Sequence, residues 1–118
     1  HERSSASALF DLLGETVANM HYGRIIHGDL TTKNILVKDK RIFLIDFGLS
    51  FISERIEDKA DDLHLLKQAL KASSSRSAVL YMSQVFKGYE KIMGSEYRRI
   101  IEHQVLKIEK RGRYARVD

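Results

Sequence analysis

Residues 24–48 are the stretch of the chain where the hydrophobic pattern changes from helical to β-type, and the rest of the fold has to be arranged around them. Two short apolar runs, 35–37 and 42–45, are separated by the turn sequence Lys-Asp-Lys, which predicts an antiparallel hairpin. The polar sequence HGDLTTKN leads into the first run, and DFG ends the second. Because the two ends of a hairpin lie side by side, Asn34 is predicted to lie near Asp46.

Apolar residues spaced three and four apart predict four helices outside this hairpin. The first covers 5–23, with Ser5 or Ser7 as its N-cap and Gly23 in the left-handed position after its end. The others run from about Asp58 to Ala72, from about Ser77 to Gly94, and from Ser95 to the RGR sequence at 111–113, with a loop at 73–75. The residues predicted to face inward are Leu9, Leu12, Leu13, Val17, Met20, Leu63, Leu66, Ala69, Leu70, Val79, Met82, Phe86, Tyr89, Met93, Tyr97, Ile101, Val105 and Ile108. The predicted class is α+β, mainly helical.

The composition excludes several classes of protein. Apolar residues make up 43% and charged residues 31%, which is typical of a soluble globular protein, and 118 residues favour one domain. No apolar run approaches the roughly 18–20 residues that span a bilayer. The chain has no cysteine for a disulfide or a thiolate site. We therefore expect a cytoplasmic protein, also nuclear if it is eukaryotic, with no membrane partner. Because the chain begins at His1, we expect a piece of a longer protein.

Positive charge is concentrated at the end of the chain, in a basic tail at 107–118. This tail carries +3 of the net charge of +4. Its basic residues are Lys107, Lys110, Arg111, Arg113 and Arg116. Such an asymmetry predicts an anionic partner. The alternative is a solvated helix end whose cations suit the helix dipole.

The polar residues at the two ends of the hairpin match the requirements of phosphoryl transfer. That reaction needs a carboxylate that orients the attacking group, and oxygen ligands that hold magnesium against the nucleotide phosphates. An Asp and an Asn five residues apart, followed after a strand pair by DFG, is the kinase arrangement of these parts. Asp29 is the predicted base or orienting carboxylate, and Asn34 and Asp46 are the predicted magnesium ligands.

Neighbouring residues differ from the ordinary protein-kinase pattern. His27 is predicted to hold the loop in place, and Gly28 replaces the Arg that pairs with a phosphorylated activation loop, so activation of that kind is not expected. Thr31 replaces the usual Lys, and Lys33 can supply the cation for the transferring phosphate. Asp62 resembles the helix Asp that anchors the catalytic loop in kinases. Without proline the chain has no A-P-E motif, which disfavours a broad-specificity protein kinase.

The sequences HGDLTTKNILV, LIDFGLSFISERIEDKADDLHLL and RGR together resemble the small atypical kinase subunit of the KEOPS complex, from about Arg24 to Arg113. The resemblance implies a Ser/Thr kinase-fold ATPase that supports threonylcarbamoyl modification of adenosine in tRNA. It also implies that this lobe binds the larger KEOPS catalytic subunit beside other subunits, and that the basic C-terminus acts with tRNA. Autophosphorylation is described for the family, and Ser50 and Ser53 are the candidates here.

The upper lobe of a kinase supplies a Gly-rich loop and a phosphate-pairing Lys, and both are missing from this sequence. No Gly-x-Gly-x-x-Gly is present, and no lysine precedes Lys33. Residues 1–118 are therefore expected to be the C-terminal lobe alone, which would bind ATP and Mg²⁺ poorly and hydrolyse ATP negligibly.

The exposure and contacts of four apolar residues in and after the DFG sequence can also be predicted. Phe47 and Leu49 would pack beneath an upper lobe, so we expect them to be exposed here. Phe51 and Ile52 are placed on a loop, where they either contact the larger subunit or pack locally.

Two other functions remain open from the sequence. The pattern HGDL…N…IDFG also resembles aminoglycoside and choline phosphotransferases, although these usually carry larger helical insertions than this chain has room for. The third possibility is a non-catalytic basic module that binds tRNA or a protein partner through its tail, with Tyr114 as a stacking ring.

Overall fold

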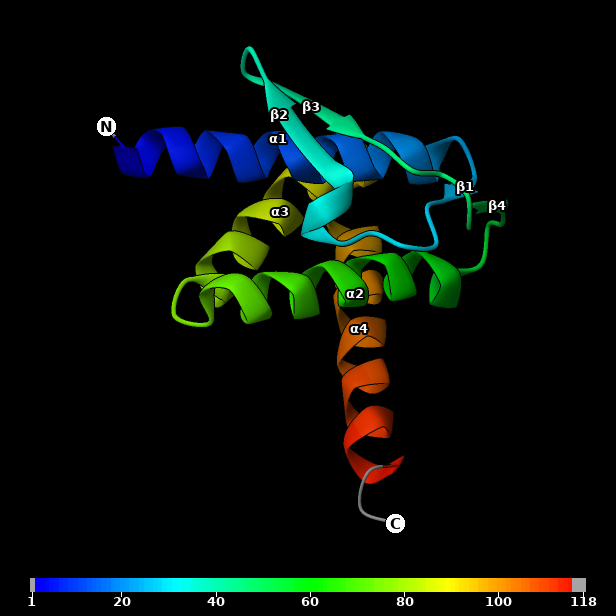
Figure 1. The fold of residues 1–118 in the computed structure, drawn as a ribbon. Helices are drawn as coiled ribbons and strands as arrows, with labels where there is room; N and C mark the ends of the chain where they lie inside the picture. Colours follow the sequence, from blue (N-terminus) through cyan, green and yellow to red (C-terminus); the bar gives the residue numbers. More distant parts are fainter. Residues whose placement is uncertain (1, 116–118) are drawn as a thin grey trace.

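The computed structural model describes residues 2–115, with side chains for residues 5–112. The described chain contains four helices and two small antiparallel sheets, which confirms the predicted mainly helical α+β class (Figure 1). In chain order the elements are α1 (Glu2–Tyr22), β1 (Ile25–Ile26), the 3-10 helix η1 (Thr32–Asn34), β2 (Ile35–Lys38), β3 (Arg41–Leu44), β4 (Phe51–Ile52), α2 (Ile56–Ser74), α3 (Ala78–Met93) and α4 (Ser95–Ala115).

The predicted hairpin is present as β2 and β3, which pair from Ile35 with Leu44 to Lys38 with Arg41. Its turn has two residues, Asp39 and Lys40, both left-handed with φ of 51° and 61°. Positive φ at both central positions is the type I′ geometry, whose twist matches that of the flanking strands. The apolar pattern and this turn together fix the register, and therefore which residues lie at the open end of the hairpin.

A second sheet, formed by β1 and β4, was not predicted. Ile25 pairs with Ile52 and Ile26 with Phe51, so the segment after DFG returns to the strand before HGD. The prediction of a loop at Phe51 and Ile52 is therefore wrong, and so is local core packing, because these side chains are 46% and 74% exposed. The physical reason is that β1 needs an edge partner, and the extended chain after DFG provides it.

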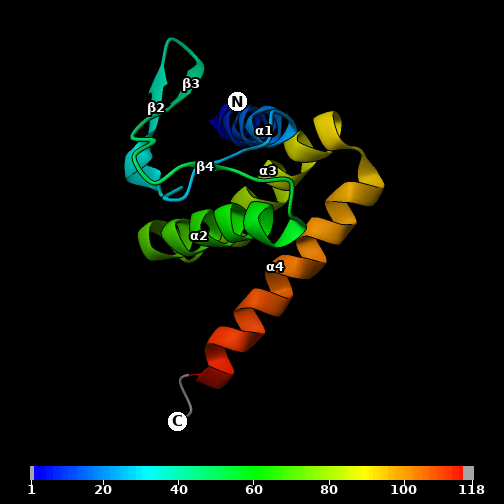
Figure 2. The ribbon, with the colours of Figure 1, turned by 90° about the vertical axis from the view of Figure 1, so that its right-hand side faces the viewer.

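Helices α1 and α3 pack closely enough for their backbones to touch. A Cβ on Gly14 would overlap the carbonyl oxygen of Val85, and a Cβ on Gly88 would overlap that of Asp11. Two glycines on facing helices therefore set the spacing of this pair. In Figures 1 and 2, α2 lies on the side of α3 away from α1, and α4 crosses behind α2 in the view of Figure 1.

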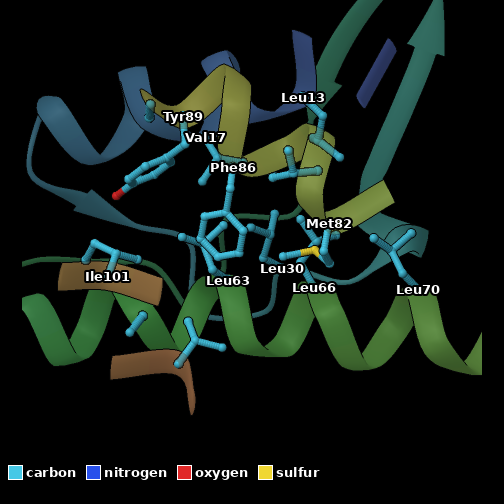
Figure 3. Packing of buried hydrophobic residues seen from close by; sticks show 14 of the residues in the cluster. Leu13, Val17, Leu30, Leu63, Leu66, Leu70, Met82, Phe86, Tyr89 and Ile101 are labelled. Carbon is cyan, nitrogen blue, oxygen red and sulfur yellow. The ribbon is translucent and has the colours of Figure 1, made fainter. Parts of the chain in front are cut away.

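One hydrophobic core lies between the helices (Figure 3). Its buried residues are Leu13, Val17, Ala18, Leu30, Ala60, Leu63, Leu66, Leu70, Ala78, Met82, Val85, Phe86, Tyr89, Ile101 and Val105. Leu30 comes from the HGDL loop, so this core also fixes the position of the candidate site. Val79, predicted to face inward, is 71% exposed, because Ala78 and Val85 lie on the buried stripe of α3 in its place.

Several predicted helix boundaries are wrong. Helix α1 begins at Glu2, so Ser5 and Ser7 lie inside it and cannot be its N-cap. The left-handed residue after α1 is Arg24, with φ of 68°, rather than Gly23, because the chain turns one residue later to enter β1. Helix α2 continues through Ser74 into the predicted loop, and α4 continues beyond RGR to Ala115.

Candidate active site

Asn34 joins the two ends of the HGDLTTKN loop. Its side chain is buried, and Nδ2 donates to the backbone oxygen of Asp29 at 2.8 Å and to its Oδ2 at 3.2 Å. The turn that makes this possible is η1, in which the Asn34 amide donates to the Thr31 carbonyl. The structure therefore brings Asp29 and Asn34 into direct contact.

The hairpin register places Asp46 one residue beyond Ile45, the partner of Asn34. The Ile45 amide donates to the Asn34 carbonyl at 2.9 Å, which extends the β2–β3 ladder by one pair. Asp46 is the next residue, exposed and left-handed with φ of 61°. This conformation is uncommon for a residue with a Cβ, and it turns the chain out of the strand directly after the ladder.

His27 connects the HGD loop to the end of β3. Its Nδ1 accepts a hydrogen bond from the Asp29 amide at 3.1 Å. Since a backbone amide can only donate, Nδ1 carries no proton and Nε2 donates to the Ile45 carbonyl at 2.8 Å. Both ring nitrogens are thus occupied by backbone groups on either side of the site, and the ring lies 4.7 Å from that of Phe47.

Asp62, buried on α2, accepts hydrogen bonds from the start of the same loop. Its Oδ2 accepts from the His27 amide at 2.9 Å and its Oδ1 from the Gly28 amide at 3.1 Å. The buried ring of His21 donates to Oδ2 from Nε2 at 2.9 Å and accepts from the Tyr89 hydroxyl at 2.8 Å. Burial lowers the pKa of His21 although Asp62 opposes this, and burial raises the pKa of Tyr89.

His21 and Tyr89 were not predicted to be parts of this site. Tyr89 was predicted only as a core residue, and His21 was not singled out. The available signal was the position of His21 four residues after Val17, on the buried stripe of α1, where a polar ring needs hydrogen-bond partners.

Gly28 occupies a position where no other residue fits. Its φ is +88°, and a Cβ would overlap the carbonyl oxygen of Leu49. The segment after DFG therefore lies directly against the HGD loop. An arginine at this position, as in ordinary protein kinases, would require the two loops to separate.

Asn34 and Asp46 both carry side-chain oxygen atoms, the kind of ligand that a hard divalent cation binds. Because Asn34 Nδ2 is engaged with Asp29, its Oδ1 is the free end of the amide, and no hydrogen bond to Oδ1 or to the Asp46 carboxylate occurs within the described part of the chain. Across residues 5–112, no group of three or more His, Asp or Glu side chains could hold a metal. A two-oxygen site completed by phosphate and water is what Mg²⁺ accepts.

Other residues singled out in the sequence lie around this centre. Lys33 is exposed on η1. The Ser50 hydroxyl donates to the Phe47 carbonyl at 2.7 Å, and the Ser53 hydroxyl donates to Asp58 at 2.6 Å. Phe47 and Leu49 are 42% and 65% exposed, which confirms the predicted exposure of both side chains.

The basic tail is helical as far as it is described. Lys107, Lys110 and Arg111 are exposed on α4, and Arg111 lies 3.3 Å from Glu57 of α2. The side chain of Arg113 and the whole of Arg116 lie outside the described residues.

Comparison with known families defines the class of this chain. It belongs to the lipopolysaccharide kinase (Kdo/WaaP) family, whose model matches residues 2–101. None of the described helices is long and apolar enough to cross a membrane.

Individual relatives are more specific, and confirm the resemblance to the small KEOPS kinase subunit. The chain is 37% identical over 102 residues to a protein named KEOPS complex subunit Bud32 from Pyrococcus abyssi, covering 86% of this chain and 46% of that protein. It is 32% identical over 110 residues to EKC/KEOPS complex subunit BUD32 from Yarrowia lipolytica, covering 93% and 44%. A Methanospirillum hungatei protein named probable bifunctional tRNA threonylcarbamoyladenosine biosynthesis protein is 41% identical over 107 residues, covering 90% and 20%. The chain therefore spans less than half the length of these relatives.

Proposed function

We propose that this chain is the C-terminal lobe of an atypical Ser/Thr kinase or ATPase that hydrolyses ATP in support of threonylcarbamoyladenosine modification of tRNA. The observation that carries the proposal is the contact of Asn34 with Asp29, with Asp46 one residue beyond the ladder pair of Asn34. The names of the KEOPS relatives support the tRNA pathway. We propose that the protein acts in the cytoplasm, and also in the nucleus if it is eukaryotic.

Each residue of the candidate site has a proposed part in the reaction. Asp29 orients the attacking oxygen and takes its proton as that oxygen bonds to the γ-phosphorus and ADP leaves with the electrons of the broken bond. Asn34 Oδ1 and the Asp46 carboxylate hold magnesium, which when bound neutralises charge on the nucleotide phosphates. Lys33 is free to approach the transferred phosphate from the exposed side of η1.

Two further residues support the catalytic loop. His27 fixes the separation of the Asp29 amide and the Ile45 carbonyl, which are the backbone groups beside the proposed base, Asp29, and the proposed magnesium ligand, Asp46. Asp62 fixes the start of the loop through two amides. We further propose that Ser50 and Ser53, whose hydroxyls have local partners, become autophosphorylation sites only when the segment after DFG moves.

The ligand and partners of the complete protein follow from the lobe assignment. We propose that residues 1–118 form the lower lobe and that ATP and Mg²⁺ bind well only when an upper lobe is present. The exposed side chains of Phe47, Leu49 and Ile52 then provide apolar surface for that lobe or for the larger KEOPS subunit.

The test is ATP hydrolysis and tRNA modification by a two-lobed protein that contains this lobe. Asp46→Ala is expected to abolish both activities because it removes a metal ligand. Asp39→Ala, which removes an exposed carboxylate from the turn of the same hairpin, is the matched control and should retain them. Hydrolysis that survives in Asp46→Ala would exclude the metal role.

A further inference from the structure

Lys59 is a buried lysine that has no carboxylate partner. It lies near the start of α2 and is only 7% exposed. Its Nζ donates to the Tyr97 hydroxyl at 2.7 Å and lies 5.0 Å from the centre of that ring. Among the side chains described, at residues 5–112, Lys59 forms no ion pair and no second hydrogen bond. Because a buried charge is costly unless it is paired, an anion would stabilise this ammonium group.

Lys59 and Tyr97 together present hydrogen-bond donors. An ammonium group can only donate, so the Tyr97 oxygen accepts in their contact and the hydroxyl proton remains available to donate. No acceptor for that proton occurs in the part of the chain that the structure describes. A group that accepts from both the ammonium and the hydroxyl is an oxyanion, and such charge-assisted hydrogen bonds are stronger than neutral ones.

Lys59 and Tyr97 line a cavity of about 410 Å³ where the ends of four helices meet. Helices α1 and α3 end here with Tyr22 and Met93, and α2 and α4 begin here, with Ile56 and Tyr97 in their first turns. In Figure 1 the end of α1 and the start of α2 lie on the same side of the molecule as β1 and β4. Pockets for small molecules have volumes of roughly 300–1,000 Å³ and mostly apolar walls, which Tyr22, Ile56 and Met93 supply here.

The charges around the cavity fit a ligand with one negative charge. Arg24 and Glu54 also line it, and they pair with each other at 3.1 Å. The ring of His21, another lining residue, has both nitrogens hydrogen-bonded within the core. Lys59 therefore carries the charge that remains unbalanced in the described lining. A carboxylate balances it, whereas a phosphate dianion would bring a second negative charge beside Glu54.

We propose that this cavity, which we call the Lys59 cavity and define by Tyr22, Ile56, Lys59, Met93 and Tyr97, binds the anion of a small aliphatic carboxylic acid. The carboxylate accepts from Lys59 Nζ and from the Tyr97 hydroxyl, and the aliphatic chain packs against Ile56 and Met93. None of the proposed catalytic or metal-binding residues lines the cavity. The proposal therefore does not depend on phosphoryl transfer or on tRNA.

The test is a titration of the isotope-labelled 118-residue chain with sodium hexanoate at constant ionic strength, followed by the amide signals in nuclear magnetic resonance spectra. Hexanol, which has the same carbon chain without the charge, is the matched ligand. Lys59→Met retains most of the side-chain length and removes the ammonium group, and Tyr97→Phe removes the hydroxyl alone. Lys87→Met, at an exposed lysine of α3 outside the cavity, is the control variant.

Hexanoate is expected to shift the amide signals of residues that line the Lys59 cavity, and the shifts should saturate. Lys59→Met should weaken hexanoate binding by about 10- to 100-fold, because it removes a charged hydrogen-bond donor. Tyr97→Phe should weaken it by about 3- to 10-fold, because it removes a neutral one. Lys87→Met should bind hexanoate like the parent protein, and hexanol should bind the parent more weakly than hexanoate does.

Several results would overturn the proposal. These are the absence of saturable shifts at millimolar hexanoate, equal affinity for hexanol and hexanoate, and equal losses in Lys59→Met and Lys87→Met. Tighter binding of inorganic phosphate than of hexanoate would overturn the choice of a carboxylate. Tighter binding of N-acetyl-glycyl-leucine, whose carboxylate ends a peptide, would overturn the assignment to a small free acid. The spectra also show whether each variant is folded, and if Lys59→Met is not, Tyr97→Phe and the comparison of the two ligands decide the question.

Discussion

His21 donates a hydrogen bond to the Asp62 carboxylate across 2.9 Å, and both side chains are buried between α1 and α2. The same carboxylate accepts the amides of His27 and Gly28, so it joins the helical core to the candidate catalytic loop. Tyr89 donates to the other side of the His21 ring. The position of the loop therefore depends on three buried side chains, those of His21, Asp62 and Tyr89.

The pKa of His21 makes stability depend on pH. Burial lowers this pKa below the ordinary value of 6.5, so as the pH falls below about 6.5 the unfolded chain takes up a proton that the folded chain does not. We expect the free energy of unfolding to be greatest above this pH and to decrease below it. Urea unfolding between pH 5 and 8 measures the slope, which should be smaller in His21→Gln.

The pKa of His64 is lowered in the same direction, mainly by burial, so His64→Gln is the comparison variant. Each substitution is expected to remove its own part of the slope. An unchanged slope in His21→Gln would contradict the assignment.

Removing the Asp62 carboxylate is predicted to be severely destabilising. Asp62→Ala would leave three donors without an acceptor, namely His21 Nε2 and the amides of His27 and Gly28. We expect a loss of about 3 kcal/mol or more in the free energy of unfolding. Asp61→Ala, on the exposed side of the same turn of α2, should change it by less than about 0.5 kcal/mol.

Hydrogen exchange separates loss of the loop anchor from general loss of stability. Asp62→Asn retains an acceptor oxygen. Relative to the parent protein, this substitution should accelerate exchange of the His27 and Gly28 amides more than exchange of the amides in the middle of α3. Uniform acceleration throughout the chain would indicate global destabilisation instead.

The hairpin could be predicted because it depends on local sequence. Two apolar runs separated by a short polar turn determine it without knowledge of the rest of the fold. The β1–β4 pairing could not be predicted in this way, since it joins strands of two residues that are 25 positions apart and carry no pattern of their own. The partners of His21 are also distant, since they lie on α2 and α3 and become neighbours only after the helices pack.

Two glycines at the contact of α1 with α3 are predicted to tolerate a side chain less well than a glycine outside this contact. Gly88→Ala and Gly14→Ala would each force a Cβ against a backbone carbonyl, which cannot move without separating the helices. We expect losses of about 1–3 kcal/mol or more. Gly112→Ala, on α4 with nothing within 4 Å of the new Cβ, should instead stabilise by up to about 1 kcal/mol. Thermal unfolding of the three variants checks this order, and a neutral Gly88→Ala would contradict the packing.

Gly28 is predicted to tolerate no side chain. Gly28→Ala combines a left-handed backbone with a clash against Leu49, and we expect a loss of about 2 kcal/mol or more. Gly48→Ala, whose Cβ would lie 3.6 Å from Asp46 Oδ1, is the comparison within the same pair of loops and should cost less than about 1 kcal/mol. Equal stability of the two variants in urea would show that the loops separate easily.

The turn of the hairpin offers a stabilising substitution. Lys40 has a φ of 61°, a conformation that costs a residue with a Cβ roughly 1–2 kcal/mol, whereas glycine adopts it freely at some cost in chain entropy. Lys40→Gly should therefore raise the free energy of unfolding by about 0.5–1 kcal/mol. Lys38→Gly, two residues earlier within β2, should lower it by a similar amount because glycine weakens a strand. Because Lys40→Gly leaves the register of β2 and β3 unchanged, Asn34 should remain opposite Ile45. Nuclear Overhauser contacts between the Ile45 amide and residue 34 would verify this.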